Sequence, residues 1–162
     1  MDIKRISSAL SVSPQIAATD IATLKAEGFR SIICNRPDGE GADQPNFEEI
    51  RAAAEAAGME VRYIPIQTGM VRDADADAFG AALQDLPGPV FAYCRSGTRS
   101  ATLWSLAMAK TLPIAHILGA TKAAGYDMNG VARRITNGGK TPTDTGDAAY
   151  DVVVVGAGAG GI

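Results

Sequence analysis

Short apolar strands that alternate with amphipathic segments are the feature that most constrains the fold of this chain. Three runs rich in β-branched and aromatic residues, "FRSIICN", "MEVRYIPI" and "PVFAY", are each followed by a segment with apolar residues at helical spacing. This order predicts an α/β fold in which a parallel central sheet is flanked by helices on both faces. Ligands of such sheets bind beyond the carboxyl ends of the strands.

Capping signals place the helices between these strands. Ser13 and Pro14 are typical of an N-cap and a first helical residue, so we expect a first helix from there to Gly28. Asn46 with Glu49 has the capping-box form and predicts a helix from about Phe47 to Ala57. Further helices are expected at 73–86, 101–110, 114–124 and 128–135.

Size and charge limit the classes of partner. A chain of 162 residues with 15 basic and 18 acidic side chains can bury one core and has no large positive field, which argues against nucleic acid or an anionic membrane as main partner. It has only two cysteines, no signal-peptide-like segment and no apolar run long enough to span a bilayer. We therefore expect a soluble, cytoplasmic protein whose anionic substrate is bound by a local site.

The Cys94 loop (residues 94–100, "CRSGTRS") is the strongest candidate site. It leaves a strand, contains Gly97 and enters a helix, so several backbone N–H groups are expected to point at one anion. The helix N-terminus, Arg95 and Arg99 favour the thiolate form of Cys94, which is the form that attacks. Hydroxyl groups that could bind the sulfur or an anion belong to Ser96, Thr98 and Ser100. The alternative is a buried structural cysteine with solvent-facing arginines.

Other residues are candidates for the same site. Arg36, in "CNRPDGE" together with Asp38 and Glu40, is predicted to add a cation there, although the segment also has the composition of an ordinary turn. Cys34 is interpreted as core filling, with a resolving thiol as the alternative. The single histidine, His116, has no clustered ligands, so no metal site is predicted.

A general acid is missing from the place where a phosphatase would need one. After Ile66 the chain reads "QTGMVRD", so the first carboxylate is Asp73. Asp73 is more simply explained as the N-cap of the following helix, with Asp75 and Asp77 favoured by the helix dipole.

These motifs resemble known families. "CRSGTRS" is similar to the active-site loop of rhodanese-type sulfurtransferases, whereas the order of strands and helices resembles dual-specificity protein tyrosine phosphatases. Together with "NRPDGE", over residues 3–110, the chain resembles the phosphatase-like domain of β-lactamase-hydrolase-like proteins, whose members have been described as phosphatases and as sulfurtransferases. The phosphatases have five residues between cysteine and arginine, whereas four separate Cys94 from Arg99 here.

The shorter loop and the missing acid together favour sulfur transfer. The first hypothesis is a sulfurtransferase in which Cys94 carries a persulfide taken from a small anionic sulfane donor, with Arg95 and Arg99 binding that donor. The second is a phosphatase that forms a phosphocysteine on Cys94, with Arg99 clamping phosphate. The third is a non-catalytic anion-binding regulatory domain.

The end of the chain predicts a second unit. We expect a domain at 1–136, a flexible linker at 137–149, and at 150–162 a strand with the spacing G-x-G-x-x-G at Gly156, Gly158 and Gly161. This tail resembles the opening strand of FAD-dependent pyridine nucleotide-disulfide or sulfide:quinone oxidoreductases. The helix and acidic residue that would complete the site do not follow, so the chain as given is expected to bind no cofactor. The resemblance implies a longer oxidoreductase containing FAD, with that domain as partner.

Overall fold

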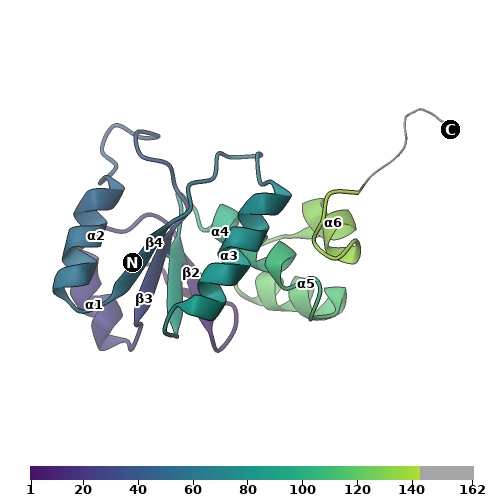
Figure 1. The fold of residues 1–162 in the computed structure, drawn as a ribbon, viewed down its shortest axis with the longest axis horizontal. Helices are drawn as coiled ribbons and strands as arrows, with labels where there is room; N and C mark the ends of the chain where they lie inside the picture. Colours follow the sequence, from purple (N-terminus) through teal and green to yellow (C-terminus); the bar gives the residue numbers. More distant parts are fainter. Residues whose placement is uncertain (143–162) are drawn as a thin grey trace, which may run out of the picture.

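A computed structural model describes residues 1–142 as a five-stranded sheet covered by helices on both faces (Figure 1). The strands are β1 (Lys4–Arg5), β2 (Leu10–Ser13), β3 (Ser31–Cys34), β4 (Glu60–Tyr63) and β5 (Val90–Tyr93). The helices are η1 (Ala18–Asp20), α1 (Ile21–Ala26), α2 (Phe47–Ala56), α3 (Asp73–Asp85), α4 (Thr98–Ala107), α5 (Ile114–Ala123), η2 (Asn129–Val131) and α6 (Ala132–Thr136).

The sheet has the order β1-β2-β5-β3-β4, and all its pairs except β1 with β2 are parallel. The predicted α/β class with a parallel central sheet flanked by helices is confirmed. Because β5 is central, the loop that follows it opens at the middle of the carboxyl edge, where parallel sheets bind ligands.

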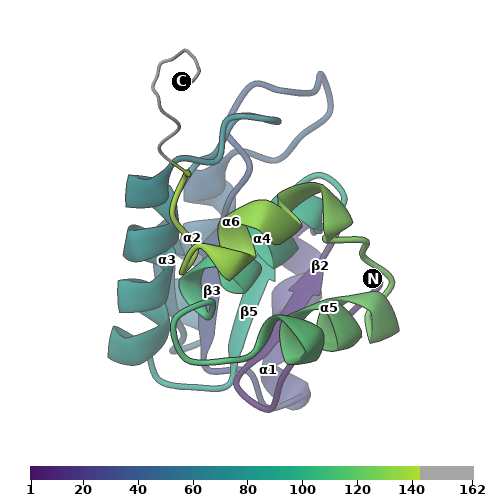
Figure 2. The same cartoon turned by 90° about the vertical axis from the view of Figure 1, so that its right-hand side faces the viewer.

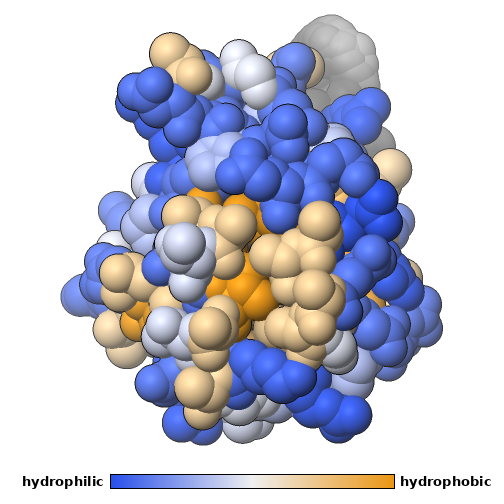
Figure 3. All heavy atoms as spheres, turned by 90° about the vertical axis from the view of Figure 1, so that its left-hand side faces the viewer, coloured by the Kyte–Doolittle hydropathy of each residue, from blue (hydrophilic) through white to orange (hydrophobic). Residues whose placement is uncertain are grey.

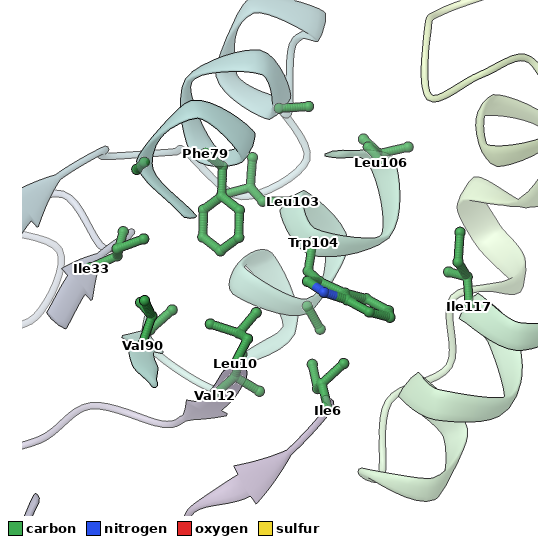
Figure 4. Packing of buried hydrophobic residues seen from close by; sticks show 14 of the residues in the cluster. Ile6, Leu10, Val12, Ile33, Phe79, Val90, Leu103, Trp104, Leu106 and Ile117 are labelled. Atoms are coloured by element: carbon green, nitrogen blue, oxygen red, sulfur yellow. The ribbon is translucent and has the colours of Figure 1, made fainter. Parts of the chain in front are cut away.

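Side chains of the sheet alternate between two cores, because successive residues of a strand point to opposite faces. Ile32 and Phe91 pack with α1 and α2, whereas Ile33 and Ala92 belong to the core that includes residues of α3 to α6. The second core contains Phe79, Leu103, the single tryptophan and Ile117 (Figure 4). Figure 2 shows α5 and α6 beside α4, so the last helices extend one layer of the fold.

The prediction for the first helix was wrong. Ser13 is not an N-cap but the last residue of β2, buried and paired with Tyr93 of β5. The helical turn begins only at Ala18, and its cap is the Asp20 carboxylate, which accepts the N–H of Ala17 at 2.9 Å. Pairing with the central strand therefore overrides the local capping signal of Ser13 and Pro14.

The surface over α1 and α2 carries an apolar patch in the middle of this face, ringed by hydrophilic residues (Figure 3). Within residues 1–142, Met1, Tyr63 and Met70 are the large hydrophobic side chains that are exposed. No helix in this part of the chain is long and apolar enough to cross a bilayer.

The predicted linker lies only partly within the described residues. Lys140 pairs with Asp77 at 2.9 Å, and the N–H of Thr141 donates to Asp73 at 3.0 Å, so this part of 137–149 contacts α3. The rest of the linker, and the glycine turn of Gly156, Gly158 and Gly161, lie outside the described residues.

Candidate active site

The Cys94 loop joins the central strand to α4 in a tight turn. Gly97 has a φ of +93° and is the N-cap of α4, which starts at Thr98 and thus three residues earlier than predicted. The left-handed conformation turns the backbone inward, and the N–H of Gly97 donates to Cys94 Sγ at 3.0 Å. The sulfur therefore lies against a helix N-terminus, as the sequence predicts.

Cys94 is fully buried. A buried cysteine is also what a structural role would give, but these surroundings are polar. The hydrogen bond with the Glu40 carboxylate raises the pKa of the Arg99 guanidinium. Burial opposes this rise and the hydrogen-bonded Cys94 sulfur adds to it, so the pKa is raised overall. The sulfur therefore has a permanent cation and a backbone N–H beside it, unlike the apolar surroundings of a structural cysteine.

Arg99 is held by a bidentate ion pair. Its Nη1 and Nη2 donate to Glu40 at 2.7 and 2.9 Å, and Nη1 also donates to the carbonyl of Ile66 at 2.7 Å. Three of the five guanidinium N–H groups are thus engaged, which leaves the others for the sulfur or an anion. Arg99 is 7% exposed, so its position is set by these bonds.

Arg36 reaches the site through Glu40 rather than directly. Its Nε donates to Glu40 at 3.0 Å and its Nη1 to Gln15 at 3.1 Å. Arg36 does not line the cavity beside the Cys94 loop. It therefore helps to fix the carboxylate that fixes Arg99.

A cavity of about 480 Å³ adjoins the loop. Among its lining residues are four that the sequence predicts to bind substrate or take part in the chemistry: Arg95, Ser96, Thr98 and Arg99. Arg95 lines the cavity, is exposed and has no ion-pair partner among residues 1–142, so its charge is available to an anion bound there. Arg134 of α6 lines the same cavity, a contribution from the last helix of the described chain that sequence reasoning missed.

Ser100 is directed away from this cavity. It is fully buried, and its hydroxyl donates to Asn35 Oδ1 at 2.8 Å. Asn35, which sequence reasoning missed, also donates from its side chain to Ile64 O at 2.9 Å and from its backbone to Tyr93 O at 2.8 Å. The available signal was a polar residue directly after the apolar run "SIIC". Asn35 ties the ends of β3, β4 and β5 together beneath the loop.

Among residues 1–142, no carboxylate lines the cavity. Asp73 is not the N-cap of α3, because the N-cap is Arg72 and the side chain of Asp75 accepts its N–H at 3.0 Å. Asp73 instead accepts Arg134 Nη2 and the N–H of Thr141, both at 3.0 Å. Asp77 pairs with Lys140. All three candidate acids thus have partners away from Cys94.

Cys34 is buried in the core beside α2. Burial raises the pKa of its thiol to about 11, although hydrogen bonds with Tyr93 and Arg36 oppose the rise. A protonated, buried thiol agrees with core filling. No group of His, Cys, Asp and Glu able to hold a metal ion occurs within residues 1–142.

Comparisons with known proteins identify the family and the fold. The family described as "Beta-lactamase hydrolase-like protein, phosphatase-like domain" matches residues 2–111. A β-lactamase hydrolase-like protein of Agrobacterium fabrum is 42% identical over 106 residues, which are 65% of this chain and 25% of that protein. The chain therefore matches only about a quarter of the length of this curated relative.

Solved structures carry the same fold. A putative phosphatase from Neisseria meningitidis is 32% identical with a TM-score of 0.77, over 85% of this chain and 99% of that one. The core catalytic domain of a PP-IP phosphatase from S. cerevisiae has a TM-score of 0.60 over 83% of each chain, at 11% identity, and so shows likeness of fold alone. The predicted phosphatase-like architecture is confirmed.

Proposed function

Because the chain belongs to the family of phosphatase-like domains of β-lactamase hydrolase-like proteins, we propose that it is a cysteine-dependent phosphatase acting through a phosphocysteine on Cys94. The observation that carries the proposal is the sulfur at the end of the central strand, with the Gly97 N–H at 3.0 Å and Arg99 beside it. The likeness to the putative phosphatase from Neisseria meningitidis supports this hypothesis over sulfur transfer, which was the first expectation.

The reaction uses groups that the site contains. The Cys94 thiolate attacks phosphorus, an S–P bond forms, and the P–O ester bond breaks to release an alkoxide or phenolate. Water then attacks the phosphocysteine, the S–P bond breaks, and inorganic phosphate and the thiolate are released. Arg99, Arg95 and the hydroxyl groups of Ser96 and Thr98 are the groups we assign to the phosphoryl oxygens.

The cavity as residues 1–142 form it has no carboxylate, and this limits the substrates of such a phosphatase. Without a carboxylate to protonate it, the leaving oxygen takes its proton from water, which is tolerable only when the leaving group is a weak base. We therefore expect aryl phosphates to be hydrolysed and simple alkyl phosphates to be poor substrates.

Sulfur transfer is the second candidate, favoured by the four-residue spacing between Cys94 and Arg99 and by the same missing acid. The thiolate would attack the outer sulfur of thiosulfate, form an S–S bond, and release sulfite as the original S–S bond breaks. Sulfite is a stable anion and needs no proton.

One experiment separates the candidates. The wild-type chain and Cys94→Ser are each incubated with 4-nitrophenyl phosphate or with thiosulfate, and turnover and intact mass are measured. The phosphatase proposal expects nitrophenol release that Cys94→Ser abolishes. A Cys94-dependent gain of one sulfur without phosphate turnover would instead establish sulfur transfer. If neither occurs, a non-catalytic anion-binding domain is the better account.

The attached oxidoreductase domain and its FAD stay predictions. They depend only on residues 150–162, outside the described part of the chain, and the full reading frame of the gene tests them.

A further inference from the structure

The peptide unit between Ser96 and Gly97 is held from both of its ends. Its carbonyl oxygen accepts a hydrogen bond from the hydroxyl of Tyr126 at 3.1 Å. Its N–H, on Gly97, donates to Cys94 Sγ at 3.0 Å. Because a trans peptide is planar, with C=O and N–H on opposite sides, a group that fixes the direction of one also fixes the other.

Tyr126 is brought to the loop by the way α5 ends. Gly125 has a φ of +97°, its N–H donates to Lys122 O at 2.9 Å, and the N–H of Tyr126 donates to Thr121 O at 2.9 Å. These two bonds form a Schellman motif, which reverses the chain at a left-handed glycine. The reversal sends Tyr126 back toward the Cys94 loop.

The contact also explains why position 97 is glycine. A Cβ built on Gly97 would overlap the hydroxyl oxygen of Tyr126 and lie 2.9 Å from Cζ. The phenol ring therefore packs directly on the backbone of the loop.

The hydroxyl stays a donor at every physiological pH. Burial raises the pKa of Tyr126 to about 12, with smaller contributions from the nearby charges of Cys94 and Asp2. The phenol is consequently protonated and donates its hydrogen to the carbonyl of Ser96. A carbonyl that accepts a hydrogen bond polarises its peptide and strengthens the N–H on the other side as a donor.

We propose that Tyr126 is a positioning residue for the nucleophile, holding the Ser96–Gly97 peptide so that its N–H stabilises the thiolate of Cys94. The inference rests on the proposed role of Cys94 as nucleophile. It adds that the helices after Lys110 are part of the site, since Tyr126 lies beyond the segment 2–111 that the family match covers.

Tyr126→Phe removes only the hydroxyl and tests this role. The rate of Cys94 alkylation by iodoacetamide is measured from pH 5 to 10, with peptide mass mapping to separate Cys94 from Cys34. We expect the pH midpoint of alkylation to rise by about half to one unit and the rate at pH 7 to fall about 3- to 10-fold, as for one weakened hydrogen bond to a charged sulfur. The melting temperature, recorded alongside, should change little.

Ser105→Ala is the matched control. It deletes another hydroxyl near the loop, a buried one in α4 that donates to Ala101 O at 2.9 Å and does not touch the loop. Its alkylation profile should equal that of the wild type. An unchanged midpoint in Tyr126→Phe, or an equal shift in both variants, overturns the proposal.

The outcome is separable from that of the proposed function, because alkylation needs no substrate. The wild type could turn over neither 4-nitrophenyl phosphate nor thiosulfate while its pH midpoint of Cys94 alkylation still depends on Tyr126. That result would refute the proposed activity alone. A wild-type Cys94 that resists alkylation up to pH 10 in the folded chain would refute the positioning role, because the sulfur would then be an inert structural thiol.

Discussion

Glu40 is the residue on which the geometry of the arginines depends. Its carboxylate accepts Arg99 through two bonds and Arg36 through one, and its side chain is 26% exposed. In Glu40→Gln the two guanidinium groups face each other without the intervening charge. We expect the free energy of unfolding at pH 7 to fall by about 1.5–3 kcal/mol, the range for hydrogen bonds to charged groups. Urea denaturation measures it.

The same substitution has a defined pH signature. The hydrogen bond from Arg99, assisted by Arg36 and opposed by burial, lowers the pKa of Glu40 below its ordinary value of 4.5. A group whose pKa is lowered by folding stabilises the protein above its unfolded pKa, and this contribution is lost as the pH falls through the folded pKa. The difference between wild type and Glu40→Gln should therefore be full at pH 7 and shrink below pH 4.5. Glu55→Gln, which alters an exposed pair on α2, should change little at either pH. A constant difference down to pH 3 would contradict this assignment.

At the scale of elements, the junction between β5 and α4 depends on one glycine. Gly97→Ala should destabilise the fold both because φ is +93° and because the new methyl group meets Tyr126. Gly28→Ala is a matched control, since Gly28 has a φ of +99° at the end of α1 and open space around its Cα. The control should lose about 1–2 kcal/mol for the left-handed backbone, and Gly97→Ala at least ~1 kcal/mol more for overpacking. Equal losses in denaturant melts would show that Tyr126 does not press on the loop.

The elements themselves were predictable where local signals act alone. The helix of Asn46 and Glu49 begins at Phe47 as expected, because its cap needs no distant partner, and Asn46 accepts the N–H of Glu49 at 3.0 Å. The strand Leu10–Ser13 was missed because its four residues show little β pattern and become a strand by pairing with β5. A short stretch of sequence does not show that it will pair with residues 80 positions away.

For the whole molecule, the sequence predicted the fold and the position of the Cys94 loop, since alternating strands and helices leave few arrangements. It could not predict which distant groups meet that loop. Tyr126 and Arg134 come from the last part of the described chain, and their roles depend on how α5 and α6 pack on α4.

A pair of isoleucines tests whether the late helices share the core of the molecule. Ile117 of α5 and Ile50 of α2 are both fully buried, on opposite sides of the sheet. Each change to Ala should lower the free energy of unfolding by about 2–5 kcal/mol, as for a large side chain removed from a packed core. Only Ile117→Ala should alter the fluorescence of Trp104, the single tryptophan, because the indole lies in the same cluster as Ile117 (Figure 4). If Ile117→Ala loses less than ~1 kcal/mol while Ile50→Ala falls in the expected range, α5 does not share the core. A site completed by Tyr126 would then lack the rigid support it requires.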